Sequence, residues 1–215
     1  MNNMQEVKPQ KIRQKKKLFE FTTKNMILAA VLTGLSLLFP LIFPRIDIGI
    51  TSVTPFSHLA IMIGVFLNPF VALFTCMGAL GAFLITGANL MVLMRATSHI
   101  IFAVVGSIFF FKGKGYKGVS FYAVCGIITL LHAIGEMAAA LIALAIGVAG
   151  ALDAYQILVV IGLITCAHSI VDYSFAVIIY NTLRSAKLVD NRFDLRIIKK
   201  KKAKETTAET TTDNQ

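Results

Sequence analysis

The sequence predicts an all-α integral membrane protein, a bundle of six transmembrane helices with both termini in the cytoplasm. Of its 215 residues, 56% are hydrophobic and only 15% are charged, whereas about a quarter of the residues in a soluble domain are charged. The mean hydropathy of +0.75 points the same way. The apolar residues gather in six runs, and nearly all basic residues lie outside those runs.

The six apolar runs approach the length of a membrane span, which needs about 20 residues. They are expected near residues 26–43, 57–68, 70–86, 92–111, 119–148 and 156–182. The second run is short, and Asn68-Pro69 separates it from the third. Because proline interrupts a helix and restricts the residue before it, two helices are expected here instead of one long helix.

The net charge of +10 lies mainly at the two ends of the chain. All Lys and Arg residues except Arg45 and Arg95 lie in the N-terminal segment, the connection 112–117 or the C-terminal part of the chain. With six spans, these segments all face the cytoplasm, as the positive-inside rule requires. The lysine run 199–204 contains no aromatic residue, which argues against a nucleic-acid surface.

Three regions follow from this distribution. We expect a basic cytoplasmic segment over residues 1–24, a membrane domain over 25–185, and a basic, largely disordered cytoplasmic tail over 186–215. The outer connection 44–55 contains alternating β-branched residues. It is either an ordered loop or lid, or a plain linker.

Ionisable side chains inside the apolar runs are the main indication of function. Three runs carry a polar pair with a spacing of four, namely Arg95/His99, His132/Glu136 and His168/Asp172. That spacing places both members on one helix face. Ionisable groups at membrane depth usually face the bundle interior or a water-filled cavity, so the three pairs suggest one shared polar pocket.

The rise of ~1.5 Å per helical residue suggests a depth for each pair. Arg95 is expected near the outer surface, with His99 one turn deeper. Glu136 and His168 are both expected about 18 Å below the outer ends of their helices, with His132 and Asp172 level one turn further in. The deeper pairs either form the floor of a ligand site or only join the fifth and sixth helices as buried polar contacts.

Arginine binds carboxylates bidentately, so Arg95 with His99 suits a small carboxylate ligand. The other interpretation of Arg95 is a side chain that reaches the lipid headgroups. His58, Tyr173 and Asn89 are further candidates for ligand contact. The cysteines Cys76, Cys125 and Cys166 lie in apolar runs without CxxC spacing, and are expected to behave as small hydrophobic residues.

Small residues in the first helix form a separate pattern. Ala29/Thr33 and Ala30/Gly34 each have the spacing of four that allows close helix packing. Such a face either packs inside the bundle or docks another subunit. The chain contains no P-loop, no dinucleotide-binding fingerprint and no HExxH motif. Nothing in the sequence therefore indicates a nucleotide-driven or zincin-type activity of its own.

Two stretches resemble the substrate-binding S components of energy-coupling factor (ECF) transporters, in particular the niacin type. One runs from Pro55-Phe-Ser-His-Leu-Ala60 to Asn68-Pro-Phe70, and the other is Arg95-Ala-Thr-Ser-His-Ile-Ile-Phe-Ala103. The resemblance covers about residues 24–185. It implies a multi-pass protein of the cell membrane that binds a vitamin, with niacin as the first candidate, at the extracellular side, and that is not an enzyme.

The resemblance also implies partners and docking residues. Such S components associate with a transmembrane coupling subunit and two cytosolic ATPases, and dock through the small residues of the first helix, here Ala29, Ala30, Thr33 and Gly34. No cofactor, resident metal or catalytic residue is expected. The alternative is an intramembrane metal-dependent enzyme, in which the His, Glu and Asp residues of the fifth and sixth helices are the metal ligands.

Overall fold

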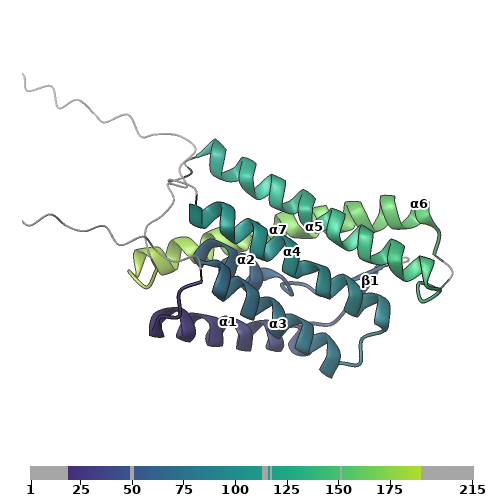
Figure 1. The fold of residues 1–215 in the computed structure, drawn as a ribbon, viewed down its shortest axis with the longest axis horizontal. Helices are drawn as coiled ribbons and strands as arrows, with labels where there is room; N and C mark the ends of the chain where they lie inside the picture. The colour runs from purple at the N-terminus through teal and green to yellow at the C-terminus, as the bar shows by residue number, and fades with distance from the viewer. Residues whose placement is uncertain (1–18, 49–50, 113–115, 117, 151, 190–215) are drawn as a thin grey trace, which may run out of the picture.

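The computed structural model describes residues 19–48, 51–112, 116, 118–150 and 152–189, and it forms an elongated helical bundle (Figure 1). The helices are α1 (Thr23–Ile42), α2 (Leu59–Leu67), α3 (Pro69–Ile85), α4 (Leu90–Lys112), α5 (Val119–Ala145), α6 (Ala154–Gln156), the π-helix η1 (Ile157–Ile161) and α7 (Gly162–Ser185). Each predicted apolar run is therefore helical, and the last one comprises α6, η1 and α7. Most of the predicted segment 1–24 and of the tail 186–215 lies outside the described residues.

The predicted break between the second and third runs is confirmed. Asn68 is extended, with φ −170°, and its side chain caps α3 by accepting a hydrogen bond from the Val71 amide at 3.0 Å. Pro69 begins α3 at a position where a helix needs no amide donor. The cap and the proline together end α2 and start α3 in a new direction.

The connection between α1 and α2 is ordered in its described part, and it corrects the all-α prediction in one detail. Strand β1 (Ile46–Ile48) pairs with β2 (Thr51–Val53) as an antiparallel hairpin, with Ile46 opposite Val53. Ile, Val and Thr favour strands because their branched side chains suit a pleated surface. The alternating β-branched residues noted in the sequence are the signal for this hairpin.

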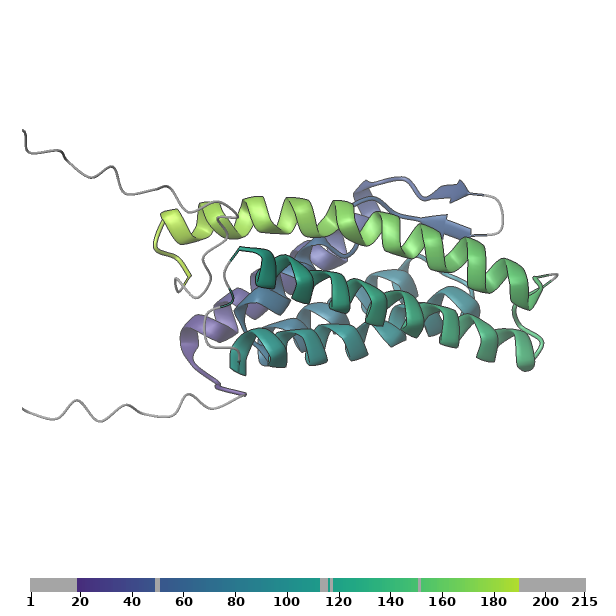
Figure 2. The same ribbon diagram turned by 90° about the horizontal axis from the view of Figure 1, so that it is seen from above.

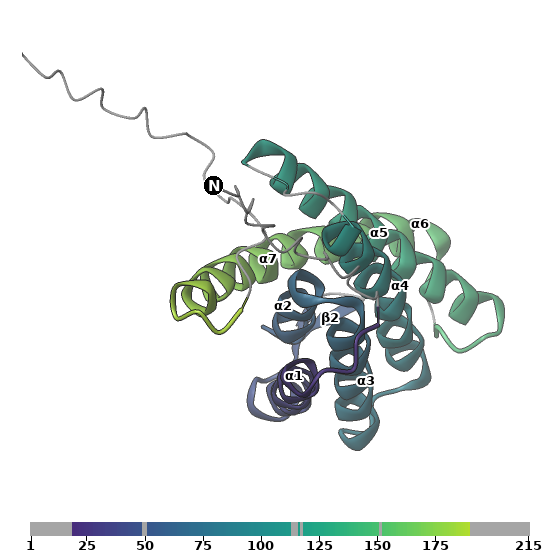
Figure 3. The ribbon, with the colours of Figure 1, turned by 60° about the vertical axis from the view of Figure 1, so that its left-hand side comes forward.

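Helix α2 lies at the centre of the bundle and contacts α1, α3, α4 and α7 (Figure 3). All of its nine residues are buried. At ~1.5 Å per residue it is about 14 Å long, which is too short to cross a bilayer. Among the described residues, four helical stretches are long and apolar enough to do so, namely α1, α4, α5 and the continuous run Ala154–Ser185, while α3 has 17 residues.

Helices α1 and α3 run side by side in close contact (Figure 1). A Cβ atom at Gly78 would lie 2.6 Å from Ser36 Oγ and 2.9 Å from the Thr33 carbonyl oxygen, so only glycine permits this approach. Ser36 Oγ also donates a hydrogen bond to the Thr75 carbonyl at 2.9 Å. Close packing around small residues and interhelical hydrogen bonds are typical of membrane helices.

The outer surface of the bundle is apolar along its length. Large hydrophobic side chains such as Ile85, Leu163 and Ile178 are more than half exposed. Contiguous apolar surface of this kind suits lipid and is rare on soluble monomers. The described ends of the chain lie at one end of the bundle, and the hairpin and the α5–α6 turn lie toward the other (Figure 2). The protein therefore has the construction of an integral membrane protein.

Candidate ligand-binding site

The three predicted polar pairs meet in one buried cluster. The pairs come from α4, α5 and α7, and His58 joins them from the N-cap of α2. The i, i+4 spacing turns both members of each pair toward the bundle axis, where His132 and Asp172 are 1% and 2% exposed. The three pairs therefore lie together, as the sequence predicted, and we call this group of side chains the polar cluster. Its members are His58, Arg95, His99, His132, Glu136, His168 and Asp172.

Glu136 is the centre of the polar cluster. Its Oε2 atom accepts hydrogen bonds from Arg95 Nη2 at 2.5 Å, Arg95 Nε at 3.2 Å and Thr165 Oγ1 at 2.7 Å. Its Oε1 atom lies 2.9 Å from His99 Nε2 and 3.4 Å from His132 Nε2. A buried carboxylate is tolerated only when it is paired and hydrogen-bonded, and both oxygens of Glu136 meet that requirement.

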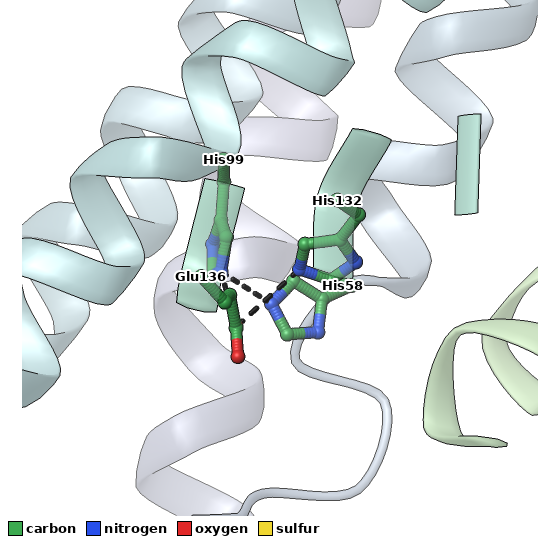
Figure 4. A group of neighbouring side chains, drawn as sticks. All are labelled: His58, His99, His132 and Glu136. Atoms are coloured by element: carbon green, nitrogen blue, oxygen red, sulfur yellow. Dashed lines mark hydrogen bonds and ion pairs between the residues drawn. The ribbon is translucent and has the colours of Figure 1, made fainter. Parts of the chain in front are cut away.

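The histidines form a second set of contacts around Glu136 (Figure 4). His58 Nε2 lies 3.1 Å from His99 Nε2, while the other ring nitrogen of His58 lies 3.2 Å from Ser57 Oγ. His132 Nδ1 lies 2.8 Å from Ser169 Oγ. The polar residues thus join α2, α4, α5 and α7.

Asp172 is the second carboxylate of the polar cluster. Its Oδ2 atom is 3.6 Å from His58 Nδ1 and 3.5 Å from His168 Nδ1. His168 is the least buried member, with a side chain 15% exposed. Asp172 therefore connects α7 to the start of α2 through His58.

These contacts correct the depth scheme drawn from the sequence. Arg95 was expected to stand apart near the outer surface, and Glu136 was expected to lie level with His168. Instead Arg95 pairs with Glu136, and on α7 Glu136 meets Thr165 while His132 meets Ser169. The start of α4 and the end of α5 lie at the same end of the bundle (Figure 2). Measured from there along the helix axes, the backbone of Arg95 is about 8 Å deep and that of Glu136 about 14 Å deep. The long arginine side chain covers the ~6 Å difference, so backbone depth alone does not locate the charged group.

A cavity of about 240 Å³ opens beside the polar cluster, at the end of the bundle that carries the hairpin. Its polar lining includes Arg45, Thr54, Ser57, His58, Thr86, Arg95, His99, Glu136 and His168, and its apolar lining includes Pro40, Val53, Phe83 and Val92. Pockets for drug-sized ligands measure roughly 300–1,000 Å³, so this cavity suits a smaller molecule.

Two predicted site residues lie outside the polar cluster. Tyr173 is buried against Phe66, with ring centroids 5.9 Å apart. Asn89 accepts a hydrogen bond from the Val92 amide at 2.9 Å, so its side chain caps the start of α4. His132 and Asp172 belong to the polar cluster but do not line the cavity. They lie behind its wall.

The sequence analysis did not identify several residues of the site. Thr165 and Ser169 share the buried face of α7 with Asp172 at the spacing i, i+4, i+7, and this polar stripe is the signal that could have revealed them. Ser57 precedes His58 directly. Arg45 lines the cavity from the start of the hairpin, and no helical periodicity points to a residue in a connection.

Neither a protein-family profile nor a solved structure matches the chain. The chain is similar to the niacin transporter NiaX of Lactococcus lactis subsp. cremoris (strain MG1363). The two are 28% identical, and the similarity covers 84% of each chain. The similarity thus extends over most of the membrane domain. It confirms the resemblance to niacin-type S components that the sequence indicated.

Proposed function

We propose that this protein is the substrate-binding membrane subunit of an ECF-type transporter and captures niacin, as nicotinate, at the extracellular side for ATP-driven uptake. The observation that carries the proposal is a small cavity beside a buried Arg/His/Glu cluster in a chain similar to a niacin transporter. The relative is a transporter, so the proposal does not include an enzymatic reaction.

The charges around the cavity favour an anion. Arg45 and Arg95 line it together with one carboxylate, Glu136, so this lining carries a formal charge of +1 with neutral histidines. Guanidinium and imidazole groups are suitable donors to a carboxylate. Both guanidinium groups line the cavity, and we assign the contact with the ligand carboxylate first to Arg45, which enters the cavity lining next to the hairpin. His168, which also lines the cavity, acts with it as a donor.

The remaining lining suits an aromatic ring. Phe83, Val92 and Pro40 form the apolar part of the cavity wall, and a pocket of this kind holds a ring through burial while a few polar groups orient it. Nicotinate combines a small ring with one carboxylate. The proposal therefore names a ligand whose two parts match the two parts of the lining.

The transport cycle then requires partners. We propose a membrane coupling subunit and two cytosolic ATPases, docked with the help of the exposed small residues Ala30 and Gly34 of α1. In the proposed orientation the cavity faces outward, the described ends of the chain face the cytoplasm, and the helices cross the cell membrane as a multi-pass bundle.

Binding of nicotinate to the purified protein tests the proposal. Titration calorimetry in detergent should detect nicotinate, and should detect nicotinamide much more weakly because nicotinamide carries no charge. Arg45→Gln should weaken nicotinate binding about 10- to 100-fold, the effect of losing a hydrogen bond to a charged group. Lys112 lies in the last turn of α4, whereas the cavity lies near the first turns of that helix. Lys112→Gln is therefore the matched control, and this variant should bind nicotinate normally. Absence of nicotinate binding, or equal affinity for nicotinamide, would contradict the proposal.

A further inference from the structure

We propose that His58, His99, His132 and Glu136 form a binding site for a divalent transition-metal ion of the zinc class at the inner wall of the cavity. Three imidazoles and one carboxylate are ligands that such ions prefer in proteins. The inference goes beyond the proposed function, because metal binding is measured without reference to any vitamin.

The geometry of the four ligand atoms supports the assignment. The Nε2 atoms of His58 and His99 are 3.1 Å apart, and Oε1 of Glu136 lies 2.9 Å from His99 Nε2 and 3.4 Å from His132 Nε2. All four ligand atoms lie within 4.8 Å of one another. A tetrahedral ion with Zn–N distances of ~2.0–2.1 Å places its ligand atoms about 3.3 Å apart. The three observed distances between ligand atoms, 3.1, 2.9 and 3.4 Å, are close to that value.

An unpartnered buried nitrogen is an independent observation. His132 Nε2 is fully buried and has no hydrogen-bond partner among the described residues, although it points toward Glu136 Oε1. A buried polar atom without a partner is costly. A metal ion between His132, His99 and Glu136 would supply the missing contact.

Contacts on the far side of the ligands hold them in the orientation that a metal needs. His132 Nδ1 meets Ser169 Oγ, and His58 Nδ1 lies near both Ser57 Oγ and Asp172 Oδ2. These contacts suit a proton on Nδ1, which leaves Nε2 with its lone pair for the metal. Histidine ligands usually have such outer partners.

The carboxylate ligand is oriented in the same way. Glu136 Oε2 is held by Arg95 and Thr165, so Oε1 alone faces the histidines. Among the described residues, His99 Nδ1 is the one outer ligand nitrogen without a partner. The other three ligands, His58, His132 and Glu136, each have a polar partner on the side away from the proposed ion.

A second group, His58 with His168 and Asp172, also lies close enough to share an ion. It has three ligands instead of four, and His168 is only partly buried. Asp172 also faces the Nδ1 atoms of His58 and His168, as an outer carboxylate partner does. We therefore assign the ion to the set that contains His132 and Glu136, with Asp172 as a positioning residue.

The experiment measures metal in the full chain, purified through a tag that contains no histidine. After treatment with a chelator and reloading with Zn²⁺ or Co²⁺, mass spectrometry of the metal content should find about one equivalent. His132→Asn should lower the affinity at least 10-fold, and Ser169→Ala should lower it about 10-fold as an outer-partner change. The matched control is His168→Asn, which should retain the metal.

The Co²⁺ spectrum of the unmutated protein keeps the test valid if a variant does not fold. Strong visible d–d absorption, as expected for four-coordinate nitrogen and oxygen ligands, supports the site. Less than about 0.1 equivalent after reloading would overturn it. Loss of metal in His168→Asn with retention in His132→Asn would overturn the ligand assignment. Nicotinate binding without metal refutes this inference alone, whereas metal without nicotinate binding refutes the proposed function alone.

Discussion

Glu136 receives contacts from Arg95 and His99 on α4, His132 on its own helix and Thr165 on α7. At 3% exposure it depends on these partners instead of water. Taking one partner from a buried ion pair leaves a charge without compensation, and this costs much more than replacing the whole pair. The pair formed by Arg95 and Glu136 is therefore a joint requirement for stability.

The first prediction concerns that pair. Arg95→Gln should destabilise the protein by about 3–5 kcal/mol, since it leaves Glu136 buried without its cation. Glu136→Gln should have a similar effect. The double variant should recover much of the loss, because no uncompensated charge remains. Thermal melts followed by circular dichroism in detergent provide the measurement, with Lys112→Gln as a surface-charge control. Strictly additive effects of the two changes would argue against an energetic pair.

At the scale of an element, the structure separates the two small-residue faces of α1 that the sequence left equivalent. Ala29 is buried, and Thr33 contacts the position of Gly78 on α3. Ala30 and Gly34 are exposed, and a Cβ atom at Gly34 would meet nothing within 4 Å. The first face packs the bundle, so the second is the one suited to another membrane helix.

The second prediction follows from this separation. Ala30→Trp should abolish nicotinate uptake in cells that express the full transporter, because the large ring blocks close approach of the coupling subunit. It should leave nicotinate binding by the purified subunit intact. Ala29→Trp, one residue away, should instead reduce folded protein, since it overfills the contact with α3. Unchanged uptake with Ala30→Trp would rule out this face as the docking surface.

At the scale of the whole molecule, the two ends of the bundle differ in chemistry. The cavity, the hairpin and the turns 86–89 and 146–153 lie at one end. The start of α1 and the ends of α4 and α7 lie at the other (Figure 2). Basic residues favour the cytoplasmic side of a membrane. Their concentration in sequence segments next to these helix ends is the basis for our proposal that the cavity faces outward.

The third prediction tests this orientation. Val148→Cys, in the α5–α6 turn, should react with a membrane-impermeant maleimide on intact cells. Lys112→Cys should react only after the cells are opened. Both positions are exposed. Cys76 and Cys125 are buried but Cys166 is partly exposed, so both variants are made in a Cys166→Ser background to keep the background labelling low. The reverse labelling pattern would place the cavity on the cytoplasmic side.

The amino-acid order by itself determined where the helices lie and which residues turn inward. Runs of apolar residues form helices wherever water is excluded, and Asn68-Pro69 ends one because a cap and a missing amide act locally. The spacing of four likewise predicted that each polar pair shares a face, since helix geometry alone sets it.

Only the tertiary structure decided which of these faces meet. It paired Arg95 with Glu136, placed His58 among three histidines from other helices, and brought Arg45 to the cavity. These contacts join residues about 40 positions apart or more along the chain. They depend on the rotation and register of packed helices and on the reach of long side chains. No local periodicity encodes those quantities, because many helix arrangements bury the same apolar faces.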